Sequence, residues 1–149
     1  MSKSNSVLVF VTPQLKCSKL IEAGKAIALE SNAQLEILSI FPTKSCFEPN
    51  TQALEKLYDF AKTYDAQMTV YFSDDAVYTA AGHSAKLKPL IVVTGFPGEN
   101  SSKFVHSFHS LLPKIPVSMV DAQGKIYRIL PSSINAEKAA KVKVLHKTE

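Results

Sequence analysis

Short apolar runs alternate with amphipathic stretches along most of the chain. The first run, residues 7–11, is rich in β-branched side chains and stops before Pro13, which is typical of a strand buried on both faces. Similar runs predict further strands at residues 35–41, 68–72, 90–94, 116–120 and 126–130. Between them, apolar positions recur at helical spacing and predict four helices at about residues 15–32, 51–64, 74–88 and 102–112.

This alternation of strands and helices predicts an α/β fold. Strands that alternate with helices pair in parallel, because each helix forms the crossover between two strands. The helices then cover both faces of the sheet. Right-handed crossovers leave few topologies for such a chain. We expect a three-layer, doubly wound, Rossmann-like sandwich whose five-stranded parallel sheet has the order 3-2-1-4-5.

Charge divides the chain into two parts. Residues 1–121 hold 11 lysines and 11 acidic residues, so the predicted α/β domain is neutral. The whole net charge of +4 lies in residues 122–149, which we interpret as a basic C-terminal extension with a short strand, a tail and a frayed helix from Ala136 onward. A small excess of charge at one end favours a solvated tail over a tail that binds nucleic acid, so we do not expect a nucleic-acid partner.

Composition excludes several classes of protein. A 149-residue chain with 46% apolar residues can bury a core without disulfides or metal ions. No apolar run reaches the roughly 20 residues of a membrane span, and the N-terminus has no secretory pattern. Cys17 and Cys46 make no disulfide framework. These features predict a cytoplasmic protein that does not enter the membrane.

The predicted topology places a ligand site where strand order reverses, outside the carboxyl ends of the first and fourth strands. Glycines let the second of the two loops there turn tightly, and serines follow where a helix begins, so its free N–H groups suit a phosphate. The alternative is an ordinary tight turn followed by helix caps. The candidate ligand-binding residues are Thr12, Pro13, Gly95, Gly98, Ser101 and Ser102.

Several segments together resemble the universal stress protein family. They are VLVFVTP, LIEAGKAIA, LEILSIF, ALEKLYDFAKTYDAQMTVYF, IVVTGFPG and FVHSFHSLLPKIPVSMVD, in that order. The chain is also similar to the stress-protein-like cytosolic segment of potassium-sensing histidine kinases. The resemblance spans about four fifths of the chain. It implies ATP, AMP or another phosphate-containing ligand, and a homodimer made by pairing edge strands, here through residues Pro116 to Val120.

Two positions depart from the family's nucleotide-binding pattern. That pattern is Gly-x2-Gly-x9-Gly-Ser/Thr, and Gly95 and Gly98 match its first two glycines. The third glycine falls at Phe108, inside a predicted helix, so the phosphate loop is expected to be short. The family's aspartate after the first strand corresponds to Thr12. A shorter pocket for a different anion, or no ligand, remains open.

Other reactive residues have simpler interpretations. His106 and His109 are three apart on a helix and could bind a metal, but we interpret them as solvated. Cys17 lies near a helix start yet has no base beside it, so an inert thiol is favoured over a nucleophile. Asp74 and Asp75 are interpreted as helix caps in preference to metal ligands. We predict no metal site and no enzymatic activity.

Two hypotheses follow. In the first, the chain is a binding or signalling protein that holds a nucleotide or another anion at its degenerate glycine loop without catalysis. In the second, it is a ligand-free interaction or dimerisation domain with a vestigial nucleotide site.

Overall fold

The computed structural model describes residues 5–11, 18–46, 51–95, 102–121, 123–129 and 144–146. The predicted strands and helices are present, with ends shifted by a few residues. In chain order the elements are β1 (Ser6–Val11), α1 (Ser18–Glu30), β2 (Gln34–Phe41), the single 3-10 turn η1 (Thr43–Cys46), α2 (Thr51–Thr63), β3 (Gln67–Phe72), α3 (Ala76–Leu87), β4 (Ile91–Gly95), α4 (Ser102–Leu111), β5 (Val117–Val120), β6 (Ile126–Ile129) and β7 (Val144–His146).

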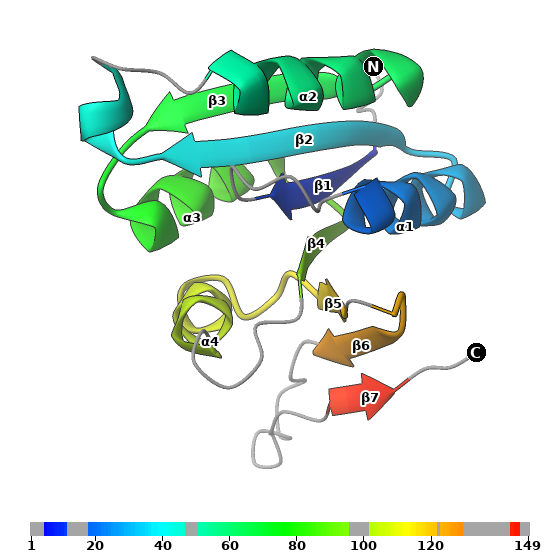
Figure 1. Cartoon of the computed structure of the whole chain (residues 1–149). Coiled ribbons are helices and arrows are strands. Elements are labelled where there is room, and N and C mark those ends of the chain that lie inside the picture. The colour runs from blue at the N-terminus through cyan, green and yellow to red at the C-terminus, as the bar shows by residue number, and fades with distance from the viewer. Residues whose placement is uncertain are drawn as a thin grey trace.

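The described strands form one sheet in the order β3-β2-β1-β4-β5-β6-β7 (Figure 1). The first five are parallel, and their order confirms the predicted 3-2-1-4-5 topology. Beyond these five parallel strands, β6 pairs antiparallel with β5 and β7 pairs antiparallel with β6. The doubly wound sheet therefore continues into an antiparallel end.

The C-terminal part of the chain contributes strands to the same sheet. β6 is the short strand predicted after residue 125. Residues Val144–His146 form the strand β7, so the frayed helix predicted from Ala136 onward is wrong at these three residues. The segment 130–143 lies outside the described residues. The boundary drawn between residues 121 and 122 stays a prediction based on charge.

The prediction that strand 116–120 is the free edge of the sheet is wrong for the single chain. β6 covers the side of β5 that faces away from β4, with Val117 opposite Ile129 and Val120 opposite Ile126. A homodimer remains a prediction, but a second copy can reach β5 only if β6 moves away.

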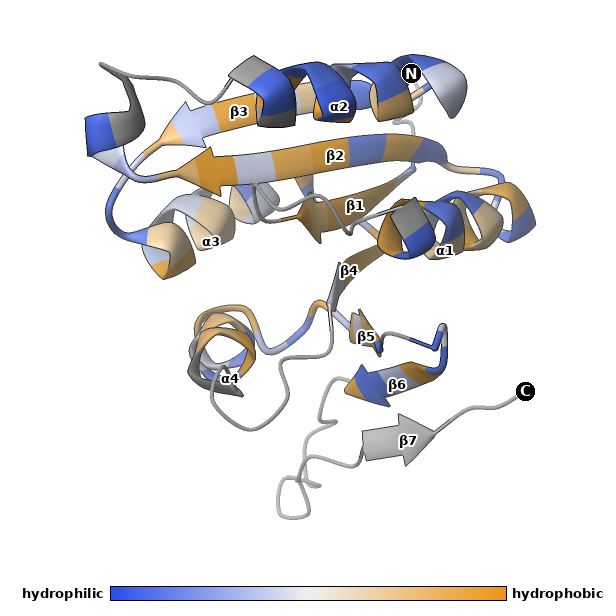
Figure 2. Cartoon of the chain, in the orientation of Figure 1, coloured by the Kyte–Doolittle hydropathy of each residue, from blue (hydrophilic) through white to orange (hydrophobic). Residues whose placement is uncertain are grey.

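Helices cover both faces of the sheet and enclose two cores. One core, under α1 and α2, is built around Val9, Ile21 and Leu57. The other, under α3 and α4, is built around Leu38 and Phe108. Figure 2 shows apolar residues along the central strands and hydrophilic residues over much of α2. No helix in the described parts of the chain is long and apolar enough to span a bilayer.

Helix α1 approaches the sheet most closely at Gly24, which is buried. A Cβ atom at this position would overlap Cγ2 of Val9 on β1 and would lie 3.4 Å from Cδ1 of Leu35 on β2. Glycine therefore lets α1 lie against β1 and β2 at a distance that no other residue permits. This contact fixes the position of the helix that follows β1.

Candidate functional site

The structure confirms a topological switch point between β1 and β4. The two strands are neighbours, with Phe10 opposite Thr94, and end together at the carboxyl edge of the sheet. After β1 the chain returns through α1 over one face, and after β4 it returns through α4 over the other. Both helices therefore begin at the edge where ligands of open α/β sheets bind.

Only part of the predicted ligand loop can be located in the structure. Gly95 is the last residue of β4 and is partly exposed, and α4 starts at Ser102. A Cβ at Gly95 would lie 4.0 Å from Cδ2 of Leu20, so this side chain of α1 lies beside the glycine. Thr12, Pro13, Gly98 and Ser101 lie outside the described residues. The structure thus places Gly95 and the start of α4 at the switch point, and all six residues stay a prediction as ligand contacts.

Helix α4 is fixed beside this edge by aromatic stacking. The ring of Phe104 stacks on that of Phe10, with centroids 4.7 Å apart and planes 10° from parallel. Phe108 stacks on Phe104 at 6.1 Å and is only 2% exposed. The position of the third glycine in the stress-protein pattern is therefore a core residue here. Only residues 96–101 remain to connect β4 to α4, which confirms that the loop is short.

The amino end of α3 already carries its own carboxylate. Oδ1 of Asp75 accepts a hydrogen bond from the N–H of Tyr78 at 3.1 Å, which confirms the predicted cap. Asp74 instead joins two loops: its Oδ2 and Oδ1 accept from the hydroxyl and the N–H of Thr43, at 2.7 and 3.0 Å. These two hydrogen bonds lower the pKa of the Asp74 carboxyl. An added anion would meet two carboxylates at this end of α3.

A third carboxylate, Asp121, follows β5 at the same edge and was not among the candidates from the sequence. Its Oδ1 accepts from the N–H groups of Gln123 and Lys125, both at 2.9 Å, and its Oδ2 accepts from the hydroxyl of Tyr127 at 3.3 Å. Because Val120 lies opposite Gly95, this negative charge is close to the end of β4.

The two histidines of α4 differ in their exposure. His106 is exposed as predicted, but His109 is half-buried, and its Nδ1 atom is buried without a hydrogen-bond partner among the described residues. No group of three potential ligands from His, Cys, Asp and Glu occurs in the described parts of the chain. Cys17 lies outside them, and Cys46 ends η1.

A histidine contact on α3 was not predicted, because its two partners come from different elements. Nδ1 of His83 on α3 lies 3.0 Å from the hydroxyl of Tyr71 on β3, and the two rings meet edge to face. Burial, and then the charge of Lys86, lowers the pKa of His83. Burial, and then His106, lowers the pKa of His109.

These two histidines predict that the protein becomes less stable in mild acid. Their folded-state pKa values lie below the usual value of about 6.5, so the unfolded chain binds more protons as the pH falls below that value. The free energy of unfolding should be constant just above this pH and decrease below it. Urea denaturation between neutral and mildly acidic pH measures the slope. The double variant His83→Gln, His109→Gln should flatten it, and an equal slope in both proteins would contradict this origin.

A shallow groove lies at the opposite, amino edge of the sheet. It measures about 370 Å³ and is lined by Asn5, Lys25, Asn32, Ala33, Gln34, Leu35 and Asp65. None of the predicted ligand-binding residues belongs to it. The groove thus provides a distinct second location against which the switch point can be tested.

Comparison with known proteins identifies the fold. No protein-family model and no curated protein matches the sequence. A universal stress protein in complex with cAMP shares 20% identity over 80% of this chain and 98% of its own, with a TM-score of 0.57. A universal stress protein family member from Burkholderia pseudomallei shares 11% identity over 78% of this chain and 96% of its own, with a TM-score of 0.58.

A third structure, a universal stress protein family member from Arabidopsis thaliana with AMP bound, shares 14% identity over 78% of this chain and 91% of its own, with a TM-score of 0.55. At these identities the likeness concerns the fold, and the finer resemblance to histidine kinases stays a prediction. The chain has the Rossmann-like α/β fold of the universal stress proteins, extended by two antiparallel strands.

Proposed function

We propose that this chain binds a nucleotide or another phosphate-containing anion at the carboxyl edge between β1 and β4, without turning it over. One observation carries the proposal: β4 ends in Gly95 at the switch point, and the amino end of α4 follows after six residues. Free N–H groups and the helix dipole at such an end attract a phosphate. Two proteins of the same fold have cAMP and AMP bound.

In this proposal Thr12 and Pro13 contact the ligand from the loop after β1. Gly95, Gly98, Ser101 and Ser102 contact it from the loop after β4. AMP is the first probe, because the connection is short and Asp74, Asp75 and Asp121 add negative charge along this edge. With no acid and base proposed beside the ligand, the protein acts as a binding or signalling module of the cytoplasm.

Calorimetric titration with AMP, ATP and inorganic phosphate tests the proposal. We expect AMP to bind the wild-type protein and Gly98→Val to lose binding, because a branched side chain would block a close approach of the loop backbone to a phosphate. At a hundredfold excess over the dissociation constant, binding adds roughly 2.7 kcal/mol of stability, or about 5–10 °C in melting temperature. Chromatography of the recovered nucleotide should show no hydrolysis.

Gly82→Ala is the matched control for Gly98→Val. Gly82 is exposed on α3, and a Cβ there would meet nothing within 4 Å, so this variant should bind AMP like the wild type. Equal binding by Gly98→Val and the wild type would place the ligand elsewhere. If none of the three ligands binds, the proposal is wrong.

In that event the second candidate, a ligand-free interaction domain, is favoured. A specific observation supports it. Phe108 fills the core at the position of the third family glycine, so the longer phosphate loop has no room to form here.

A further inference from the structure

Helix α3 is held on the sheet by few apolar contacts. Its buried residues are Ala80, Ala81 and Ser84, and Leu87 packs against the core only in part. The hydroxyl of Ser84 is buried without a hydrogen-bond partner among the described residues, which weakens the packing of the helix. On the neighbouring helix α4, by contrast, the whole ring of Phe108 is buried. Small side chains make α3 the easier of the two helices to lift from the sheet.

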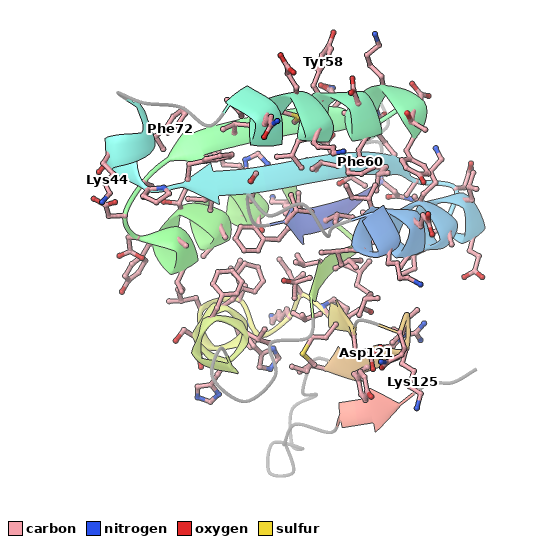
Figure 3. All side chains as sticks on the ribbon, viewed as in Figure 1. Lys44, Tyr58, Phe60, Phe72, Asp121 and Lys125 are labelled. Atoms are coloured by element: carbon pink, nitrogen blue, oxygen red, sulfur yellow. The ribbon has the colours of Figure 1, made fainter. Side chains whose placement is uncertain are left out.

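Polar contacts fasten the start of α3. The Asp74 carboxylate accepts two hydrogen bonds from Thr43 on η1, and Asp75 caps the helix. Figure 3 shows this end of the molecule, where Lys44 on η1 lies near Phe72 at the end of β3. Within the described part of the chain, a single side-chain hydrogen bond then joins the body of α3 to a strand, at its second histidine turn toward β3.

That hydrogen bond joins His83 to Tyr71. Nδ1 of His83 lies 3.0 Å from the hydroxyl of Tyr71, and the ring centroids are 5.6 Å apart in an edge-to-face contact. Nε2 is buried and has no hydrogen-bond partner among the described residues. A protonated imidazole carries an N–H on both nitrogens, so Nε2–H would be a buried donor without an acceptor. The contact therefore suits a neutral ring and not a charged one.

The charges around His83 also favour the neutral ring. Helix α3 packs against β1, β2 and α4. The described titratable side chains of these elements, of α3 and of β3 are Glu36, Tyr71, Tyr78, Lys86, His106 and His109. Lys86 acts on His83 as a second positive charge. Glu36 is roughly 13 Å along β2 from Ile40, the residue opposite Tyr71, so it lies too far away to pair with the histidine.

We propose that α3 is a flap that opens in mild acid. Uptake of a proton by His83 breaks its contact with Tyr71, and α3 then lifts from β1 and β2 while the rest of the sheet stays folded. The contact of Asp74 with Thr43 remains and serves as the hinge. Opening uncovers apolar side chains of the sheet such as Leu38. This opening does not depend on the proposed nucleotide site, and it goes beyond a general loss of stability because one helix opens first.

Amide hydrogen exchange of the full chain at pH 7.5 and 5.5 tests the proposal. The imidazole becomes free to titrate near pH 6.5 once α3 is open, so the opening constant should rise by up to about tenfold between these two pH values. We expect the protection factors of residues 80–87 to fall severalfold. At pH 5.5 they should lie well below those of β1, because α3 opens without the whole protein unfolding.

Two histidine variants identify the group responsible. His83→Gln should remove the pH response of residues 80–87, whereas His109→Gln on α4 is the matched control and should keep it. The proposal is wrong if residues 80–87 lose the same protection in His83→Gln as in the wild type. It is also wrong if these residues exchange no faster than β1, since α3 would then open only when the whole protein unfolds.

An NMR titration of the wild-type protein covers the case in which His83→Gln does not fold. Between pH 7.5 and 5.0, the ring signals of Tyr71 and His83 should shift with a common midpoint, because loss of the edge-to-face contact changes the surroundings of both rings. Tyr71 signals that stay constant while His83 takes up its proton would overturn the proposal, since the contact would then survive protonation.

Discussion

Replacing Gly24 with alanine is expected to lower the free energy of unfolding by about 2–3 kcal/mol, although alanine favours a helix by about 1 kcal/mol. The added Cβ would overlap Val9, a fully buried residue of the central strand, with Leu35 close behind. α1 must then move away from β1, which opens the core beneath it. Gly24→Val should prevent folding. Urea denaturation of the purified variants gives the free energies.

Gly82→Ala separates this packing effect from the general effect of removing a helical glycine. The position is exposed on α3 and surrounded by open space. There the substitution should raise stability by up to about 1 kcal/mol, because only the helix propensity changes. If Gly24→Ala is as stable as Gly82→Ala, then α1 does not lie as close to β1 as the structure places it.

Phe108→Ala is expected to cost about 3–5 kcal/mol of stability, the range for a large aromatic side chain removed from a core. Phe108 is 2% exposed and stacks on Phe104, which in turn stacks on Phe10 of β1. The loss should therefore loosen α4 beside the proposed ligand loop. Thermal or urea denaturation measures the change.

Leu111→Ala on the same helix is the control. Leu111 is 42% exposed, so its truncation should cost less than about 1 kcal/mol. Similar losses for Phe108→Ala and Leu111→Ala would mean that Phe108 does not pack in the core. The explanation for the short connection between β4 and α4 would then fail.

The parallel part of the fold could be predicted because its signals are local. The apolar run at residues 7–11 predicts a strand by itself. The helical period of residues 104–112 likewise predicts a helix without reference to the rest of the chain. The alternation of the two then restricts strand order through crossover handedness. The close approach at Gly24 could be placed on the inner face of α1, but its contact with Val9 required the structure.

Pairings between distant residues were beyond the sequence. Residues 126–129 look like a strand, but only the structure shows that they cover β5 and remove the edge expected there. The contact of Tyr71 with His83 joins a strand to the next helix, and no local pattern marks it. Asp121 was missed because its role depends on three donors beyond the end of β5.

The candidate site, too, could be predicted from the sequence only in part. Its location at the carboxyl edge follows from topology, and the core position of Phe108 explains why the stress-protein pattern breaks off after Gly98. The contacts that would distinguish a nucleotide from a smaller anion depend on side-chain placement around the loop. Neither residue type nor spacing determines that placement, so the identity of the ligand rests on measurement.

The most direct test of the central claim is an NMR titration of the ¹⁵N-labelled protein with AMP. If the switch point is the ligand site, the largest saturable shifts will occur at the amides of Gly95 and Ser102, where β4 ends and α4 begins. The account is contradicted if no amide shifts on titration. It is equally contradicted if the shifts centre on Asn5, Asn32 and Asp65, in the groove at the opposite edge of the sheet.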